Sequence, residues 1–379
     1  MVKVAILGAG AISGIHIAAY KQIDNCEIVA VADVDGEKAA ARVKEFGLSC
    51  RVHASIGKLA ADPGVEMVSV CLPPLLHAPA AVELAAAGKH VLVEKPMAMS
   101  LREIDEMNAA ADAAGILLGV ISQNRYKTDI QRLKGVLDSG LLGRVLSVRV
   151  DSLWWRGACY YDLKWRGRWE SEGGGPTLNH AIHQVDGLVY LMGRLPARVV
   201  SVMANLAHAN SEIEDISHSI LTYEDNAVGL LSCSVVHHGE NKLYEFQCEK
   251  GAISLPFRID ASLSLPNGFP KDNAELVEKA TAVYDGLPAL PEEGHVVQLR
   301  NMVDAVEKGE PLLLNGKAAR QPVELVTALY KSAFSGSAVD LPISVDDAEY
   351  GLAGRVARAR KYHEKTLDID SFPPAPITL

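Results

Sequence analysis

Near its start the chain reads Val2-Lys3-Val4-Ala5-Ile6-Leu7-Gly8-Ala9-Gly10-Ala11-Ile12-Ser13-Gly14, an apolar strand pattern that runs into a glycine-rich turn. A helical pattern of apolar residues follows at once, from Ile15 to Ala19. This order is typical of a dinucleotide-binding segment, because glycine lets the backbone approach a diphosphate and the helix N–H groups point at it. The spacing departs from the usual one, since Ser13 takes the third glycine position and Gly14 comes one residue late. We therefore expect cofactor contacts from four turn residues, Gly8, Gly10, Ala11 and Ile12.

The second strand pattern, residues 27–32, ends at Asp33, close to where such a segment places the acid that binds a ribose. A carboxylate there accepts hydrogen bonds from ribose hydroxyls. It would repel a 2′-phosphate about 4 Å away by roughly 4 kcal/mol before screening, and Asp35 would add to this. NAD is therefore expected as the cofactor in preference to NADP. The alternative is that Asp33 only caps the helix that begins near Gly36.

A buried strand pattern, residues 90–93, ends in Glu94-Lys95-Pro96. Open α/β sheets bind ligands at the carboxyl ends of their strands, and the proline keeps Lys95 out of the helical region. We expect Lys95 at the strand tip, facing a ligand. The alternative is a surface Glu–Lys pair of no function.

The preceding strand pattern, residues 65–71, breaks at Leu72-Pro73, because proline cannot join a central ladder. We expect Leu72, Pro73 and His77 to lie beside the glycine turn and Lys95, near the nicotinamide. As a lone histidine at a helix start, His77 is interpreted as structural rather than catalytic.

Strands alternate with helices up to residue 122, which predicts a doubly wound parallel sheet. Asn124, just after the last of these strands, is expected to contact the cofactor. Beyond it, strand patterns follow one another, which predicts an α+β domain with a largely antiparallel sheet. We predict two domains, residues 1–122 and residues 123–379. The strand patterns of the second half are 145–150, 199–203, 217–223, 227–236, 243–248 and 252–255. Helices are predicted at 128–139, 295–308, 318–335 and 348–365. Residues 255–293 have an irregular pattern, in which one further helix is predicted at 274–282.

Gly173-Gly174-Gly175 precedes a predicted helix from Pro176 to about Met192. Asn179 and His183, four residues apart, would share one face of that helix. His180 and His183 have no acidic or cysteine partner at a metal-binding spacing, so no metal is expected. Before the triplet, aromatic and arginine side chains suit either a sugar-binding wall or ordinary packing. Those assigned to the wall are Tyr160, Trp165 and Arg166.

Composition narrows the ligand class. The net charge is −10 and no basic cluster stands out, so nucleic acid is not an expected partner. No apolar run is long enough to span a membrane, and the start of the chain lacks the pattern of a secretory signal, so we expect a cytoplasmic protein. The six cysteines are scattered, without the spacing of a disulfide framework or zinc site. Small molecules are the expected ligands.

Together, the glycine turn at 8–14, Glu94-Lys95-Pro96 and the segment 173–183 resemble the family of glucose–fructose oxidoreductase and inositol dehydrogenase (Gfo/Idh/MocA). The resemblance implies an amino-terminal NAD-binding Rossmann domain. It also implies a second domain whose large, mostly antiparallel open sheet builds homodimers or homotetramers. The expected activity is oxidation or reduction of a carbinol in a sugar or cyclitol.

In that family a lysine, a carboxylate and a histidine surround the reacting carbon, which carries over to Lys95, position 179 and His183. Asn179 stands where inositol dehydrogenase-like members have aspartate. Asparagine cannot take a proton, so the resemblance favours the sugar dehydrogenases. Glu94 and Lys95 would also contact the cofactor.

The resulting hypothesis is that His183 accepts the hydroxyl proton while hydride passes to the nicotinamide and Lys95 stabilises the alkoxide. The expected substrate contacts are Lys95, Tyr160, Trp165, Arg166, Asn179 and His183. Two alternatives stay open. One is a glycoside-cleaving enzyme that keeps NAD bound and acts by oxidation and elimination. The other is a non-catalytic protein that senses NAD or a sugar.

Overall fold

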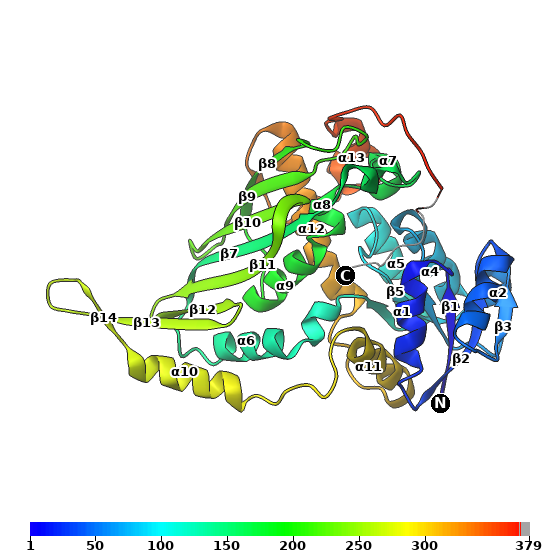
Figure 1. Ribbon diagram of the computed structural model, residues 1–379, viewed down its shortest axis with the longest axis horizontal. Helices are drawn as coiled ribbons and strands as arrows, with labels where there is room; N and C mark the ends of the chain where they lie inside the picture. The colour runs from blue at the N-terminus through cyan, green and yellow to red at the C-terminus, as the bar shows by residue number, and fades with distance from the viewer. Residues whose placement is uncertain (371, 373–379) are drawn as a thin grey trace. The chain divides into compact units, whose positions relative to one another are not determined.

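The computed structural model describes residues 1–370 and residue 372, and the chain forms two compact units (Figure 1). Unit 1 comprises residues 1–130 and 289–323. Unit 2 comprises residues 131–288 and the described residues from 324 onward. The predicted division had a single boundary at 122/123. In the structure the chain passes from one unit to the other three times, after residues 130, 288 and 323.

Unit 1 is built on a parallel sheet whose strand order, among the described residues, is β3-β2-β1-β4-β5-β6. The order reverses between β1 and β4, and such a switch point is where open α/β sheets bind ligands. The predicted doubly wound parallel sheet is therefore confirmed. Its strands are β1 (Val2–Leu7), β2 (Cys26–Ala32), β3 (Arg51–His53), β4 (Met67–Val70), β5 (His90–Val93) and β6 (Leu118–Val120). Its helices are α1 (Ala11–Tyr20), α2 (Gly36–Glu45), α3 (Ile56–Ala60), η1 (Pro74–Leu76), α4 (His77–Ala86), α5 (Leu101–Ala114), η2 (Gln123–Tyr126) and α11 (His295–Lys308).

Helix α11 explains why a segment from late in the chain belongs to unit 1. Its apolar residues Leu299, Met302 and Val303 are buried in the same core cluster as β1 and α1. Gln298 donates to the carbonyl of Val120 (2.7 Å) and accepts from the N–H of Ser122 (3.0 Å). These contacts join α11 to the end of the sheet, which the local sequence pattern could not reveal.

Unit 2 is built on a sheet with the order β14-β13-β12-β11-β7-β10-β9-β8-β15 in the described chain. Strands β7 and β10 run parallel and the other neighbours antiparallel, so the predicted mostly antiparallel sheet is confirmed. Its strands are β7 (Val145–Trp155), β8 (Arg198–Ala204), β9 (Ile216–Thr222), β10 (Val228–Ser234), β11 (Val236–Cys248), β12 (Gly251–Leu255), β13 (Arg258–Ser264), β14 (Pro270–Asp272) and β15 (Val339–Asp340). Its helices are η3 (Ala158–Asp162), α7 (Trp169–Glu172), α8 (Pro176–Asn179), α9 (Ile182–Met192), α10 (Ala274–Gly286), η4 (Ala348–Tyr350) and α13 (Leu352–Arg358).

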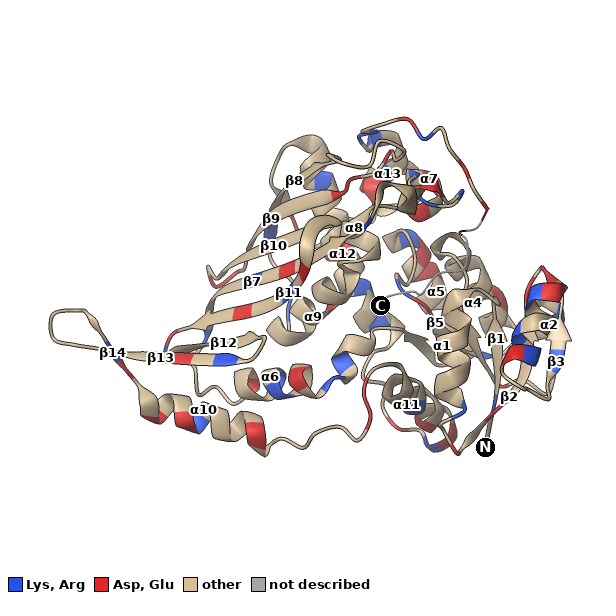
Figure 2. Ribbon diagram, viewed as in Figure 1, with Lys and Arg blue, Asp and Glu red and all other residues tan. Residues whose placement is uncertain are grey.

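Two helices cross from one unit to the other: α6 (Thr128–Asp138) and α12 (Gly316–Ser335). Figure 2 shows lysine and arginine interspersed with acidic residues along α2 and α10, so neither helix presents a charge of one sign. Within the described residues, no helix is both long and apolar enough to cross a bilayer.

Three predicted elements of unit 2 were wrong. The helix expected from Pro176 to Met192 is two helices, because the N–H of Ala181 bonds to the carbonyl of Pro176, five residues back, and the helical ladder stops there. The irregular stretch after Leu255 contains the hairpin β13–β14. The helix expected at 348–365 ends at Arg358, beyond which the chain extends to pair with residues 162–164.

Candidate active site

The glycine turn of unit 1 fits a bound dinucleotide. Gly8 has φ +97°, and a Cβ there would lie 2.5 Å from the carbonyl oxygen of Cys71, so only glycine is tolerated. Ser13 is fully buried and donates to the carbonyl of Gly10 (2.6 Å), which shows how serine replaces the usual glycine. Gly10 begins α1 without a side-chain cap, and the space at its Cβ position is open. The helix N–H groups can therefore receive a diphosphate.

Asp33 braces this turn. One carboxylate oxygen accepts from the N–H of Ala9 (2.8 Å) and the other from the N–H of Asp35 (2.9 Å). Asp35, not Asp33, caps α2, so the alternative role as a helix cap was wrong. Arg42 of α2 donates to the carbonyl of Gly10 (3.0 Å) from the other side. The turn is thus held by residues of β2 and α2 before any ligand binds.

The loop that carries the lysine is joined to the loop after β4 by His77. One ring nitrogen of His77 lies 2.8 Å from the carbonyl oxygen of Leu72 and the other 2.8 Å from that of Pro96. The side chain is buried, and burial lowers its pKa. These bonds favour the structural interpretation of His77, which brings the Leu72-Pro73 turn and Lys95 together.

A buried pair lies behind Lys95. His16 of α1 contacts Glu94 through Nε2 (2.9 Å), and His295 of α11 has its ring 5.9 Å from that of His16. Burial alone would lower the pKa of His16, but Cys71 and Glu94 raise it above its ordinary value. Burial would raise the pKa of Glu94, but the hydrogen bond from His16 holds it low.

His16, Glu94 and His295 are also the one group in the described chain whose atoms gather as metal ligands would, within 4.8 Å of one another. The contact between His16 and Glu94 has the length of a hydrogen bond. A metal would also have to displace a proton that His16 holds more tightly than usual. A proton suits this site better than a metal ion.

In unit 2, two residues of the glycine triplet, Gly174 and Gly175, are required by tight packing. A Cβ on Gly174 would lie 2.2 Å from the hydroxyl of Tyr330, and one on Gly175 would lie 2.2 Å from the carbonyl oxygen of Glu214. The carboxylate of Glu214 accepts from the N–H groups of Gly175 (3.0 Å) and Thr177 (3.2 Å) and from the Tyr330 hydroxyl (2.9 Å). Burial raises the pKa of Glu214 to about 7. No local pattern marked Glu214 or Tyr330, because both lie far along the chain from the triplet.

Asn179 is fixed by the same loop. Its Nδ2 donates to the carbonyls of Gly174 (2.6 Å), Glu172 (3.3 Å) and Gly175 (3.4 Å). An aspartate would place a carboxylate against these oxygens, which gives a physical reason for the amide. Because the helix breaks, Asn179 ends α8 while His183 lies in the first turn of α9, and the expected single helical face does not exist.

The predicted wall residues form a stack. The guanidinium of Arg166 lies 4.1 Å from the ring centre of Tyr160 and 4.0 Å from that of Trp165, and it pairs with Glu172 (2.7 Å). The Tyr160 hydroxyl is 3.2 Å from Nε2 of His180. The stack therefore adjoins the turn between α8 and α9, and aromatic faces with a guanidinium can hold a sugar ring.

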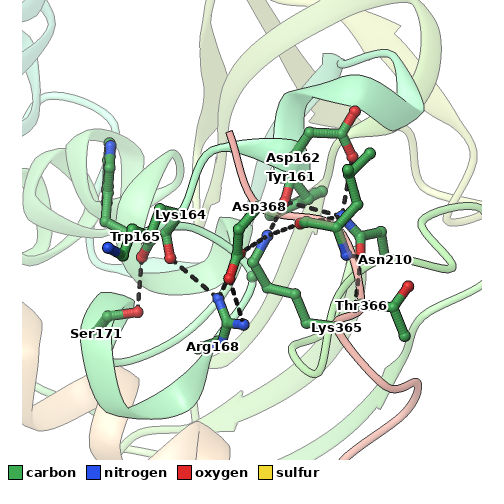
Figure 3. Close-up of polar contacts among 12 residues, drawn as sticks. Tyr161, Asp162, Lys164, Trp165, Arg168, Ser171, Asn210, Lys365, Thr366 and Asp368 are labelled. Atoms are coloured by element: carbon green, nitrogen blue, oxygen red, sulfur yellow. Dashed lines mark hydrogen bonds and ion pairs between the residues drawn. The ribbon is translucent and has the colours of Figure 1, made fainter. Parts of the chain in front are cut away.

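A strap from late in the chain, residues 365–370, fastens this region (Figure 3). Arg168 makes two bonds to Asp368 (2.7 and 2.9 Å), and Lys365 donates to the carbonyl of Tyr161. Asn210 donates to Asp162 (2.9 Å) and to the carbonyl of Leu367 (2.9 Å). The segment before the glycine triplet is thus held by chain that begins where the predicted helix 348–365 was expected to end.

The predicted site residues fall into two sets, one in each unit. Unit 1 holds Gly8, Gly10, Ala11, Ile12, Asp33, Leu72, Pro73, His77, Glu94, Lys95 and Asn124. Unit 2 holds Tyr160, Trp165, Arg166, Asn179 and His183.

Comparison with known proteins identifies the family. Residues 2–122 match the model of an oxidoreductase family with an NAD-binding Rossmann fold, and residues 130–254 match the GFO/IDH/MocA carboxy-terminal domain. The chain belongs to the Gfo/Idh/MocA family. It is thus an oxidoreductase of an NAD-binding family, and the predicted family, cofactor and enzyme class are confirmed.

Three relatives within the family are informative. The WlbA dehydrogenase from Bordetella pertussis, solved with NADH and UDP-GlcNAcA, is 30% identical, with 90% of this chain and 98% of that one covered and a TM-score of 0.77. The 1-carboxy-3-chloro-3,4-dihydroxycyclo hexa-1,5-diene dehydrogenase of Comamonas testosteroni is 28% identical over 82% of this chain and 80% of its own. The D-apiose dehydrogenase of Paraburkholderia graminis is 26% identical over 89% of each chain.

Proposed function

We propose that the protein is an NAD-dependent dehydrogenase that converts a secondary carbinol of a sugar or sugar-like ring to a ketone, or the reverse. NAD, held at the glycine turn of Gly8 and Gly10, would supply the acceptor for the hydride of the carbinol carbon. His183 takes the hydroxyl proton, and the Lys95 ammonium stabilises the negative charge that develops on the oxygen. Asn179 holds the glycine loop and orients the substrate rather than accepting a proton.

The observation that carries this proposal is the fixed lysine loop beside a glycine turn that fits NAD. His77 ties the loop of Lys95 to the turn after β4, and Gly8 packs against that same turn at Cys71. A lysine at the carboxyl end of β5 therefore belongs to the edge where the family binds the dinucleotide.

The substrate class rests on relatives and on the stack of Arg166. Two of the relatives act on or are solved with a ligand that carries a carboxyl group, UDP-GlcNAcA and the carboxy-cyclohexadiene, and a third acts on D-apiose. The Arg166 guanidinium is already paired with Glu172, so the stack supports a ring-shaped substrate through its aromatic faces, and the preference for an acid rests on the relatives alone. We therefore propose a sugar or cyclitol ring, with acidic members of the class preferred.

The test is kinetic. Purified protein is assayed for NADH formation against free sugars, cyclitols, uronic acids and nucleotide sugars, with NAD and with NADP. With the best substrate, Lys95→Met and His183→Ala are each expected to lower kcat by about 10²–10⁴-fold. Wild-type turnover by either variant would contradict the scheme. Cleavage of a glycoside without net NADH would favour the oxidation–elimination alternative, and NAD binding without any turnover would favour a sensor.

We also propose that unit 2 forms homodimers or homotetramers through the outer face of its sheet. Apolar side chains alternate outward on neighbouring strands, which leaves them exposed in one chain. They are Val200, Val202, Ile220, Val228 and Leu230, between 42% and 70% exposed. A contiguous apolar face of this kind is typical of a protein interface.

A further inference from the structure

A buried polar cluster lies behind the lysine loop of unit 1 and has no role in the scheme above. His16 is fully buried, and its two ring nitrogens are each engaged. Nδ1 lies 2.9 Å from the hydroxyl of Ser69 on β4, and Nε2 lies 2.9 Å from the carboxylate of Glu94 after β5. Tyr20 completes the cluster with its hydroxyl 3.0 Å from that of Ser69. One side chain of α1 thus links the ends of two strands.

The carboxylate of Glu94 is shared between two donors. Oε1 faces His16, while Oε2 accepts the backbone N–H of Lys95 at 3.0 Å. The orientation of this carboxylate therefore sets the direction in which the chain leaves β5. We propose that His16 is a positioning residue that acts through Glu94 to hold Lys95 at the reacting carbon. This inference rests on the proposed function of Lys95.

The charges around His16 support a fixed ion pair. The groups that face it are Cys71 and Glu94, which raise its pKa, and His295, whose ring lies 5.9 Å away. Burial is the largest effect on His295, and together with the smaller effect of the charge of His16 it outweighs Glu94. The pKa of His295 is thereby lowered to about 4, so its ring is neutral near pH 7. His16 is then the single cationic imidazole next to Glu94. A buried carboxylate without that partner would either take up a proton or turn towards other donors.

The position of His16 on α1 gives the pair a second consequence. The amino-terminal turn of α1 is the glycine turn that receives the diphosphate, and His16 lies little more than one helical turn further on. The helix that carries the cofactor turn therefore also fixes the lysine loop. A shift of Lys95 by about 1 Å would be enough to cost up to 10²-fold in rate.

Two variants separate the roles of the ring nitrogens. In His16→Gln the amide nitrogen falls near the place of Nε2 and can still donate to Glu94. In His16→Asn the shorter side chain falls near the place of Nδ1 and can reach only Ser69. The measurements are kcat and KM with the best substrate, the Kd for NAD, and Tm. We expect His16→Asn to lower kcat about 10- to 100-fold with the NAD Kd nearly unchanged, and His16→Gln to recover most of the loss.

Two further variants test whether the loss of kcat comes from the contact with Glu94. Ser69→Ala removes the other partner of His16 and is expected to lower Tm but leave kcat close to wild type. Glu94→Asp keeps the charge but is too short to reach both donors, so its kcat should fall. This variant tests the proposal even if His16→Asn does not fold. Equal kcat for the Asn and Gln variants, or wild-type kcat for Glu94→Asp, would overturn the proposal. Lys95→Met in the same assay distinguishes this from a failure of the proposed function, because wild-type turnover there removes the role of Lys95 itself.

Discussion

At the scale of single residues, the carboxyl of Glu214 has a pKa well above its ordinary value. It is fully buried and holds the glycine loop through Gly175 and Thr177, yet burial raises its pKa to about 7. The hydrogen bonds from Tyr330 and Thr177 oppose that rise without cancelling it. The loop that carries Asn179 is therefore anchored by a carboxyl that titrates near neutral pH.

This shift predicts a pH dependence of stability. The folded pKa lies above the unfolded value of 4.5, so the contribution of Glu214 is fully present below pH 4.5 and is lost as the pH rises through about 7. The full difference corresponds to about 3 kcal/mol. Chemical unfolding between pH 5 and 8.5 should show wild type losing stability with rising pH, and Glu214→Gln should flatten that slope.

The matched control is Glu212→Gln, on the same loop but paired at the surface with Lys361. It should leave the slope as in wild type. The same pH slope for Glu214→Gln and wild type would show that Glu214 carries its ordinary charge when folded.

Sequence reasoning predicted the position in the fold of residues that depend on their own segment, while their roles stay predictions. Gly8 was predicted because a strand, a turn and a helix are local patterns, and Lys95 because a proline follows it. Glu214 and Tyr330 were missed because their partners are set by tertiary packing against Gly174 and Gly175. The alternative that Asp33 caps α2 was wrong because Asp35, two residues later, accepts the N–H groups at the start of that helix.

At the scale of elements, those defined by a local pattern were predicted and those defined by tertiary packing were not. The strands of unit 1 were predicted closely because each is a short apolar run bounded by a turn. The helix from Pro176 to Met192 was predicted whole, because nothing in its composition shows the wide turn at Ala181. The helix predicted over 348–365 ends at Arg358 instead, and the pairing of the following strap with Asp162 and Lys164 is visible only in the fold.

The strap predicts an effect on substrate binding. The ammonium of Lys365 is fully buried and donates to the carbonyls of Tyr161 and Leu367. Lys365→Met keeps the apolar stem but leaves a buried carbonyl unsatisfied, at a cost of about 1–3 kcal/mol. Hydrogen exchange in residues 158–172 should become faster, and KM for the substrate should rise more than kcat falls. The control is Lys361→Met, which changes an exposed lysine four residues before Lys365 and outside the strap. Matching exchange in the two variants would exclude the strap as the cause.

At the scale of the whole molecule, the sheet of unit 2 is the feature that bears on the proposed assembly. Val200, Ile220 and Leu230 stand directly opposite one another on β8, β9 and β10, all at least 43% exposed. The outer face of an antiparallel sheet is ordinarily polar when it faces water. This row of apolar side chains is the surface on which the proposed interface with a second copy of the chain rests.

Leu230→Glu tests that explanation, because it places a charge in the middle of the row where a partner would have to bury it. Light scattering coupled to size exclusion should give a dimer or tetramer for wild type. For the variant it should give a shift towards monomer, with the dissociation constant about 100-fold higher, equivalent to roughly 3 kcal/mol. Val345→Glu changes an apolar residue of similar exposure outside the sheet and should leave the mass unchanged. A monomeric wild type, or the same mass for Leu230→Glu and wild type, would mean that this face is not the interface.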